Sequence, residues 1–282
     1  MLSYRHAFHA GNHADVLKHM VLCLLLRHLN KKDKPYAVLD THAGAGMYAL
    51  NQAYAQKNSE YMSGIGKILH HRELRDLVPE YYQVIDSINT SKSGINFYPG
   101  SPLFSCALSR ESERIYLCEL HRSEFETVYK NFKRDRRVSI NHTDGFEAMK
   151  SMLPLNPKRG LCLIDPSYEL KSDYTQVLKA LKTGLSRFPT GIFAIWYPVL
   201  GKLKDHSKNL TFDIKRTNAP LLQVELNIDG QSDDFGMNGS GMLIVNYPYG
   251  LYEELEQIMG PLFTALKDGK GSARLRILNE KD

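Results

Sequence analysis

The residues best suited to chemistry are four in a row, Asp165, Pro166, Ser167 and Tyr168, which follow the most apolar run of the chain. An amine on an aromatic ring is a poor nucleophile, because its lone pair is delocalised into the ring. The Asp165 carboxylate and the Pro166 carbonyl could both accept hydrogen bonds from that amine and direct its lone pair at a methyl donor. Proline would keep the carbonyl aimed, and Tyr168 could stack on the base. Asp165, Pro166 and Tyr168 are therefore predicted to be catalytic, the alternative being an ordinary Asp-Pro turn.

A second candidate is the glycine turn Gly44-Ala45-Gly46, which follows a short apolar run ending at Asp40. Glycine has no Cβ, so the backbone can bend sharply and come close to a ligand. Residues 44–49 also fit the pattern GxGxxA, which makes a dinucleotide site an alternative. A pyrophosphate, however, prefers bare amides without a nearby carboxylate. Asp40 suits the cationic amino-acid end of S-adenosylmethionine (SAM) better, and the turn is predicted to bind SAM.

Two more acidic residues follow predicted strands. Glu119 could accept hydrogen bonds from both hydroxyls of a ribose, or it could be a solvent-exposed acid. Asp144 could accept from an adenine amine, while Gly145 leaves room for the ring to lie on the backbone. Asp144 could equally be the N-cap of the next helix, and the two roles are compatible.

The elements that must position these residues alternate along the chain between apolar runs and stretches of helical periodicity. Strands are predicted at 36–40, 114–119, 138–141, 160–165 and 191–196, and helices at 14–29, 123–134, 144–152 and 173–187. This alternation predicts a doubly wound α/β sheet that binds ligands at the C-terminal ends of its strands. Two later strands, 221–228 and 241–247, predict an antiparallel hairpin at the sheet edge.

The span between the glycine turn and Glu119 is unusually long. In a simple nucleotide-binding unit the acid that holds the ribose lies about 20 residues past the glycines. Residues 50–95 are therefore predicted to be an inserted helical subdomain within one domain that covers residues 1–282.

The composition bounds the class of protein. With 43% hydrophobic and 24% charged residues, the 282-residue chain is typical of a globular protein. Its four cysteines lie far apart and lack CxxC spacing, which predicts reduced core thiols rather than a zinc site or disulfides. The apolar run 20–26 is too short to span a bilayer, and the N-terminus does not resemble a signal peptide. A soluble, cytoplasmic protein is expected.

Basic residues gather in two stretches, 1–34 and 130–137, and the net charge is +5. Such stretches favour an anionic partner, but they also fit an ordinary solvated surface.

A family becomes recognisable in residues 1–19, MLSYRHAFHAGNHADVLKH, which closely resemble the start of the bacterial RlmJ family. Other matching segments are 39–46, 98–102, 144–145, 196–198 and 240–242. RlmJ proteins are 23S ribosomal RNA adenine-N6 methyltransferases, and the resemblance runs nearly end to end. It implies a Rossmann-like methyltransferase fold, SAM as donor without a metal, and one adenine of 23S ribosomal RNA as target. Unassembled or locally unpaired RNA is expected as partner, with no membrane, and a monomer is expected.

The resemblance also implies roles for individual residues. Besides Asp40 and the glycine turn, the implied SAM contacts are His19, His42, Ser101, Glu119, Asp144, Gly145 and Asp165. Tyr4, His6 and Lys18 would lie on the RNA side. The basic N-terminal stretch would lie beside the mouth of the active site, where Lys18 could meet phosphates and Tyr4 could stack on or near the base.

One departure from the family concerns residue 167. The family usually has Asp-Pro-Pro-Tyr, and this chain has Ser167 at the second proline. The groups proposed to hold the amine survive, so the same chemistry is expected from a less rigid loop. Two alternatives stay open: a nucleic-acid-binding protein linked to the use of external DNA, with SAM structural or lost, and more distantly a dinucleotide dehydrogenase.

Overall fold

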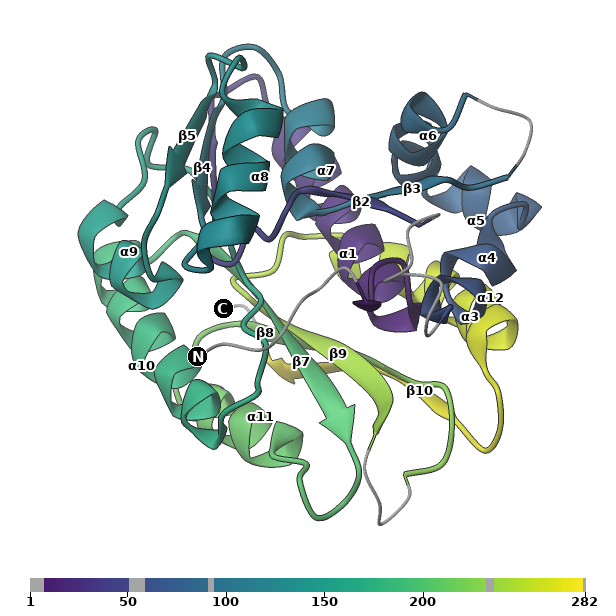
Figure 1. The fold of residues 1–282 in the computed structure, drawn as a ribbon. Coiled ribbons are helices and arrows are strands. Elements are labelled where there is room, and N and C mark those ends of the chain that lie inside the picture. The colour runs from purple at the N-terminus through teal and green to yellow at the C-terminus, as the bar shows by residue number, and fades with distance from the viewer. Residues whose placement is uncertain (1–7, 51–58, 91–93, 232–235, 281–282) are drawn as a thin grey trace.

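The computed structural model describes residues 8–50, 59–90, 94–231 and 236–280, and its centre is one eight-stranded sheet (Figure 1). The parallel strands are β1 (Ala37–Asp40), β4 (Arg114–Cys118), β5 (Val138–Asn141), β6 (Gly160–Ile164) and β7 (Ile192–Leu200). Antiparallel pairing adds β9 (Met237–Val245), β8 (Leu221–Asn227) and β10 (Ser272–Asn279). The order β10-β8-β9-β7-β6-β1-β4-β5 reverses direction between β1 and β6, where doubly wound sheets bind ligands.

Helices cover both faces of this sheet (Figure 1). One face carries α9 (Gly145–Met152), α10 (Lys171–Arg187) and α11 (Ser207–Lys215). The other carries α1 (His13–Asn30), α7 (Ser101–Leu108), α8 (Arg122–Phe132) and α12 (Leu251–Leu266). Because both faces are covered, the central parallel strands are mostly apolar, and every residue of β6 is buried.

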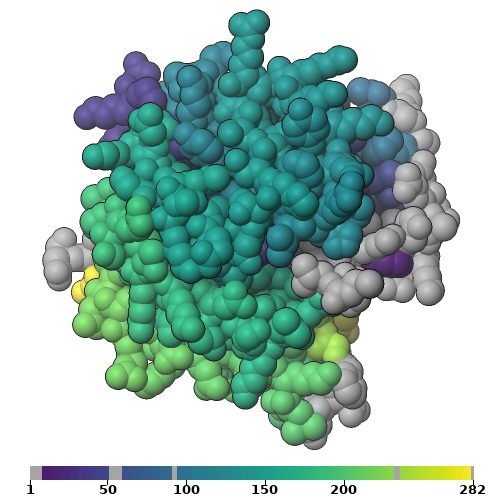
Figure 2. Space-filling view, turned by 60° about the vertical axis from the view of Figure 1, so that its left-hand side comes forward, coloured from purple at the N-terminus to yellow at the C-terminus, as the bar shows by residue number. Residues whose placement is uncertain are grey.

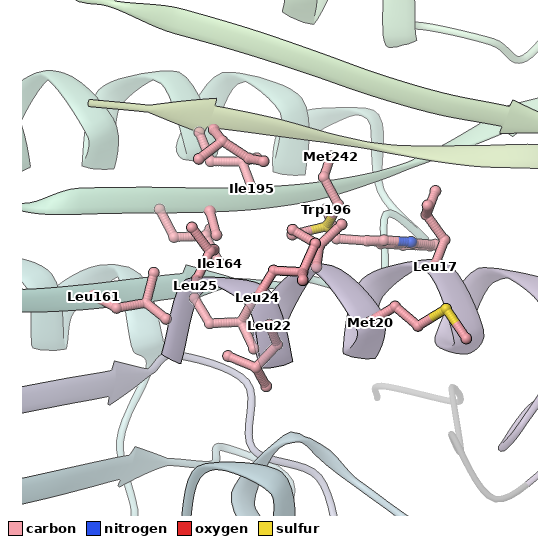
Figure 3. Packing of buried hydrophobic residues seen from close by; sticks show 14 of the residues in the cluster. Leu17, Met20, Leu22, Leu24, Leu25, Leu161, Ile164, Ile195, Trp196 and Met242 are labelled. Carbon is pink, nitrogen blue, oxygen red and sulfur yellow. The ribbon is translucent and has the colours of Figure 1, made fainter. Parts of the chain in front are cut away.

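Helix α1 lies deep in its layer, with 16 of its 18 residues buried. Figure 3 shows Leu24 and Leu25 in the same packed cluster as Ile164 and Trp196 of the sheet. The helix begins where the sequence predicts, because the Asn12 side chain accepts hydrogen bonds from two backbone amides of the first turn. Helix α1 is therefore a rigid support for the polar side chains that it carries.

Between the glycine turn and α7 lie four short helices, α3 (Glu60–Ser63), α4 (Ile65–Ile68), α5 (Arg72–Leu77) and α6 (Pro79–Ile88). Along the chain, these helices come after β2 (Met47–Ala49) and before β3 (Phe97–Pro99), and the two strands form a small antiparallel pair. Within the predicted insertion 50–95, residues 51–58 and 91–93 lie outside the described residues. In the described part, α4 and α5 contact α12, and α6 contacts α1.

The predicted doubly wound sheet is confirmed, and so is its antiparallel hairpin. Two features were not predicted: β9 lies between β7 and β8, and β10 pairs with the outer side of β8. The four cysteines are buried free thiols. Among the described residues, the helices are all too short or too polar to cross a membrane.

Candidate active site

A cavity of about 730 Å³ opens at the C-terminal ends of the parallel strands. Its walls come from the loops after β1, β4, β5 and β6, from the end of β7 and from the first turns of α1. The volume lies within the range of small-molecule sites. The topology thus brings together segments that are more than 100 residues apart in the sequence.

Most of the residues predicted for the site line this cavity. They are Lys18, His19, His42, Gly44, Ser101, Glu119, Asp144, Gly145, Asp165, Pro166 and Tyr168. Asp40 and Gly46 do not line it. Tyr4 and His6 lie outside the described residues.

The Glu119 carboxylate is anchored by two backbone amides. It accepts hydrogen bonds from the Gly44 amide at 2.8 Å and from the His121 amide at 2.6 Å. Burial raises the pKa of Glu119, and these two hydrogen bonds limit the rise. The glycine turn and the end of β4 are thereby held in one geometry, with an acceptor that faces the cavity.

The two glycines of the turn have different roles. Both have positive φ, +57° at Gly44 and +77° at Gly46, which favours glycine. A Cβ at Gly44 would collide with the Tyr48 hydroxyl, and one at Gly46 would collide with the Phe132 ring. Gly46 therefore allows α8 to pack against the turn, and its predicted contact with SAM is corrected to a packing role.

Asp40 requires a similar correction. It is fully buried, and its carboxylate accepts hydrogen bonds from the Ser101 hydroxyl at 2.6 Å and the His42 amide at 3.3 Å. Burial raises the pKa of Asp40 to about 7, although the hydrogen bond from Ser101 opposes the shift. The carboxylate faces its own support rather than the cavity, so Asp40 positions Ser101 and His42 instead of touching a ligand directly.

Asp144 is the N-cap of α9, as the alternative interpretation of the sequence proposed. Its Oδ1 accepts hydrogen bonds from the Phe146 amide at 2.7 Å and the Glu147 amide at 3.2 Å. No hydrogen bond among the described residues uses Oδ2, and Asp144 lines the cavity. Gly145 lets α9 approach the Thr41 carbonyl, which a Cβ would block. Capping and ligand binding are thus compatible here.

His42 adds a neutral imidazole to this part of the cavity. Burial lowers the pKa of His42 to about 4, so the ring is uncharged near neutral pH. Its ring packs edge-on against Phe146, with centroids 5.1 Å apart. The two rings form a mostly apolar corner of the cavity near the Asp144 carboxylate.

Asp165 forms an ion pair with Lys18, which was expected from the sequence at the RNA-binding surface. The Lys18 ammonium lies 2.6 Å from Asp165 Oδ2 and 2.8 Å from Asp15 Oδ1, and Lys18 is 4% exposed. Burial alone would lower the pKa of Lys18, but the two carboxylates more than offset burial and raise it. The Lys18 ammonium is thus buried between two acids rather than exposed at the surface, and its contact with RNA stays a prediction.

Tyr168, in the loop after β6, has a strained backbone conformation. Its φ is +52°, which is uncommon for a bulky residue. Its hydroxyl donates a 2.7 Å hydrogen bond to the Trp196 carbonyl, and its ring lies 4.5 Å from the Tyr174 ring. These contacts hold the backbone after Pro166 in place even though residue 167 is serine.

Among the described residues, the lysines and arginines of the N-terminal stretch other than Lys18 do not line the cavity, and Arg5 lies outside the described residues. Helix α1 has 18 residues, and at 1.5 Å per residue it is about 27 Å long. Arg27, near its far end, binds Glu80 at 2.5 Å and Glu254 at 3.4 Å. The rigid helix therefore carries the basic residues after Lys18 away from the active site, and the prediction that the basic stretch lies beside it does not hold for that part of the stretch.

Sequence reasoning missed Asp15 and the pair formed by His9 and Glu60, all of which line the cavity. Asp15 stands three residues before Lys18, a spacing that predicts contact on a helix and could have been found. The His9–Glu60 pair, at 2.9 Å, joins residues 51 positions apart and left no local signal. Among the described residues, no group of acidic, histidine or cysteine side chains is arranged to hold a metal.

Comparisons with known proteins agree with this geometry. A family model described as "Ribosomal RNA large subunit methyltransferase D, RlmJ" matches residues 33–278. Ribosomal RNA large subunit methyltransferase J of Escherichia coli K12 is 42% identical over 94% of each chain. The protein of the same name from Haemophilus influenzae is 41% identical, covering 96% of this chain and 97% of its own. The crystal structure of a protein from Legionella pneumophila has a TM-score of 0.88 at 37% identity, covering 95% of this chain and 98% of that one.

Proposed function

Because the chain belongs to the RlmJ family of ribosomal RNA large subunit methyltransferases, we propose that it transfers a methyl group from SAM to the N6 amine of an adenine in 23S ribosomal RNA. The observation that carries this proposal is the meeting, in one cavity, of Asp165-Pro166-Ser167-Tyr168 with Glu119 and with Asp144-Gly145. The first group suits an aromatic amine, and the other two suit the nucleoside part of SAM.

The residues of the cavity fit SAM, which supplies an activated methyl group on a sulfonium. The Glu119 carboxylate is anchored and faces the cavity, and in the proposal it accepts hydrogen bonds from the two ribose hydroxyls. In the proposal, Asp144 Oδ2 accepts from the adenine amine, beside the rings of Phe146 and neutral His42. Ser101 and His19 line the part of the cavity next to Asp165 and are assigned to the amino-acid end.

The target amine is held by the loop after β6. In the proposal, the Asp165 carboxylate and the Pro166 carbonyl each accept one N–H of the amine, and Tyr168 fixes the plane of the base. The Lys18 ammonium, 2.6 Å from Asp165, favours the ionised carboxylate. Asp165 is therefore proposed to orient the amine as a hydrogen-bond acceptor, while the proton released after transfer passes to solvent.

A paired base cannot present its amine to this loop, so the substrate adenine is proposed to be unpaired or flipped out of its helix. We also propose that the protein acts as a monomer, because one chain supplies every element of the cavity. Family membership does not favour the alternative of a nucleic-acid-binding protein linked to external DNA.

The test is radiolabelled methyl transfer from SAM to 23S ribosomal RNA, with bulk DNA as the matched acceptor. Incorporation into RNA alone is expected, at N6 of adenine when the product is digested and analysed by mass spectrometry. The companion experiment is mass spectrometry of 23S RNA from a strain that lacks the gene. If every N6-methyladenine of that RNA persisted, the proposed substrate would be wrong. Stabilisation by NAD rather than SAM in a thermal shift would revive the dehydrogenase alternative.

A further inference from the structure

The edge of the sheet opposite the cavity is strongly basic. It is formed by the four loops that lead into β1, β4, β5 and β6, residues 31–36, 109–114, 130–137 and 153–159, which we call the basic edge. These loops hold 12 lysines and arginines against 4 acidic residues, a net charge of +8. The whole chain is only +5, so the rest of the molecule has a net charge of −3.

Three arginines join these loops into one surface. Arg110 donates to the Lys32 and Lys34 carbonyls at 3.3 and 3.0 Å. Arg159 donates to the Lys34 carbonyl at 2.6 Å, and Arg137 to the Ser109 carbonyl, also at 2.6 Å. In Figure 2 the loop before β1 (purple, upper left) and the teal segments before β4 and β5 form one continuous margin. The basic edge is therefore a single built surface rather than four independent loops.

Most of the other cations of this surface are exposed. The exposed side chains for which the described residues supply no ion pair are Lys32, Lys34, Arg114, Lys130, Lys133, Arg134, Arg136 and Lys158. The exposed acids of the same loops are Asp33, which lies 3.4 Å from Arg110, and Glu111. Positive charge is thus concentrated here without local neutralisation, which favours an anionic partner.

The cavity itself has the opposite character. Among the described residues, seven carboxylates line it, and Lys18 is the only lysine or arginine that does so. The seven are Asp15, Glu60, Glu119, Glu124, Asp144, Asp165 and Asp173. Such a wall attracts the cationic SAM and repels phosphates. A polyanionic substrate therefore needs its electrostatic attraction from another part of the protein.

We propose that the basic edge is a second contact surface for the phosphate backbone of the substrate RNA, remote from the methylated base. The proposal rests on the proposed function, which supplies an RNA long enough to reach both sites. The strands between the two edges have four or five residues, so the edges are about 15 Å apart at 3.3 Å per residue. This exceeds the Debye length of about 8 Å at physiological salt, so the acidic cavity does not cancel the attraction of the basic edge.

Helix α8 offers the path between the two sites. His121 and Glu124, at its start, line the cavity, and Lys133, directly after its end, belongs to the basic edge. Between them Tyr129 is 48% exposed, with the Lys133 ammonium 5.8 Å from its ring centroid. An exposed aromatic ring beside cations is the combination that binds unpaired RNA bases. The RNA is thus expected to run along α8 from the cavity to the basic edge.

The test compares two triple variants with the same change in charge. Lys133→Glu/Arg134→Glu/Arg136→Glu alters the basic edge, and the control Lys179→Glu/Lys182→Glu/Lys215→Glu alters exposed lysines of α10 and α11. Binding of a 23S fragment that extends well beyond the methylated adenine is measured by fluorescence anisotropy over a salt series. The basic-edge variant should bind at least about tenfold more weakly, with a salt slope shallower by about two to three. The control should stay within about twofold of the wild type.

Two further measurements keep the result interpretable. The turnover number kcat on an RNA of only a few nucleotides should be unchanged in the basic-edge variant, while KM for the long fragment should rise. If the glutamate variant fails to fold by circular dichroism, Lys133→Gln/Arg134→Gln/Arg136→Gln replaces it. Equal RNA affinity of the basic-edge and control variants would overturn the proposal and leave the proposed function standing. A wild type that binds the fragment but methylates no RNA would instead sink the proposed function.

Discussion

Among the described residues, the cavity at the carboxyl ends of the parallel strands is lined by seven carboxylates and one lysine, whereas the segments at the amino ends carry 12 basic and 4 acidic residues. The two edges differ in burial as much as in sign. Lys18 and Asp15 in the cavity are 4% and 2% exposed and bind each other directly, while most of the cations of the basic edge are exposed to solvent. Buried charges have large, local effects on stability and chemistry. Exposed charges act weakly on stability and act mainly on association and its salt dependence.

The largest effect is expected from Asp165→Asn in the cavity. Asparagine replaces an anionic acceptor with a neutral amide, and its NH₂ group must point either at the target amine or at Lys18, where only an acceptor fits. Single-turnover methyl transfer to 23S RNA should fall on the order of 1000-fold. RNA affinity and SAM affinity, the latter read by thermal shift, should stay close to wild type. A normal transfer rate would remove Asp165 from the mechanism.

Lys18→Met tests whether buried charge dominates stability. The substitution leaves Asp15 and Asp165 as buried carboxylates without their shared cation, which should lower the free energy of unfolding by about 3 kcal/mol. The matched variant Lys130→Met at the basic edge should change it by less than about 0.5 kcal/mol. Urea denaturation of both variants measures the contrast, and equal losses would contradict it.

The cavity side should also respond to acid through His13. Burial lowers the pKa of His13 from 6.5 to about 4. The unfolded chain binds this proton near pH 6.5, and the folded chain does so only near pH 4, so the contribution to stability is complete above pH 6.5 and is lost as the pH falls toward 4. At pH 5 the loss is about 2 kcal/mol. Urea denaturation at pH 7 and pH 5 should show a smaller difference for His13→Gln than for the wild type, and identical differences would refute the assignment.

Glu119→Ala tests whether SAM binding and RNA binding depend on different residues. Removing the carboxylate takes away the proposed ribose contacts and the anchor of the Gly44 amide. The dissociation constant of SAM should rise about 10- to 50-fold, measured by calorimetry. Binding of RNA to the basic edge should be unaffected. A parallel loss of RNA affinity would show that the two edges do not act independently.

The smallest effect is expected from Tyr129→Ala on α8, between the two edges. Loss of one stacking platform should weaken binding of the long RNA fragment about fivefold. The salt slope should not change, because the tyrosine contributes no charge. The control is Tyr129→Phe, which keeps the ring and should keep the affinity. A change of slope in Tyr129→Ala would mean that the substitution disturbs the neighbouring lysines.

Much of the fold follows from local patterns. The buried parallel strands are continuous apolar runs, and α1 and α9 begin at the side chains of Asn12 and Asp144, which could be recognised as caps. Strand β10 was missed because none of its residues is fully buried and two of them are arginines. The pair β2–β3 was missed because each strand has only three residues. The identification of residues 50–95 as an inserted subdomain stays a prediction.

The candidate site was predicted unevenly, and the errors have a common cause. Glu119, Asp144 and Asp165, which come just after strands, do line the cavity, because parallel strands end at the same edge of a sheet. Asp40 was given a ligand role from its residue type and place before the glycines, and Lys18 from the family resemblance and its charge. In the structure, the Asp40 side chain is hydrogen-bonded to Ser101, 61 positions away, and that of Lys18 to Asp165, 147 positions away. Local sequence carries no record of such partners.

The sequence by itself determined the alternation of strands and helices, the residue types at each strand end, and through its motifs the RlmJ family. Only the tertiary structure decided which of those residues face the cavity, that Lys18 stands between two acids, and that loops from four parts of the chain form one basic edge. The physical reason is that strand and helix formation depends on residues a few positions apart. Desolvation and Coulomb interactions depend on neighbours in space, which exist only once the sheet has formed.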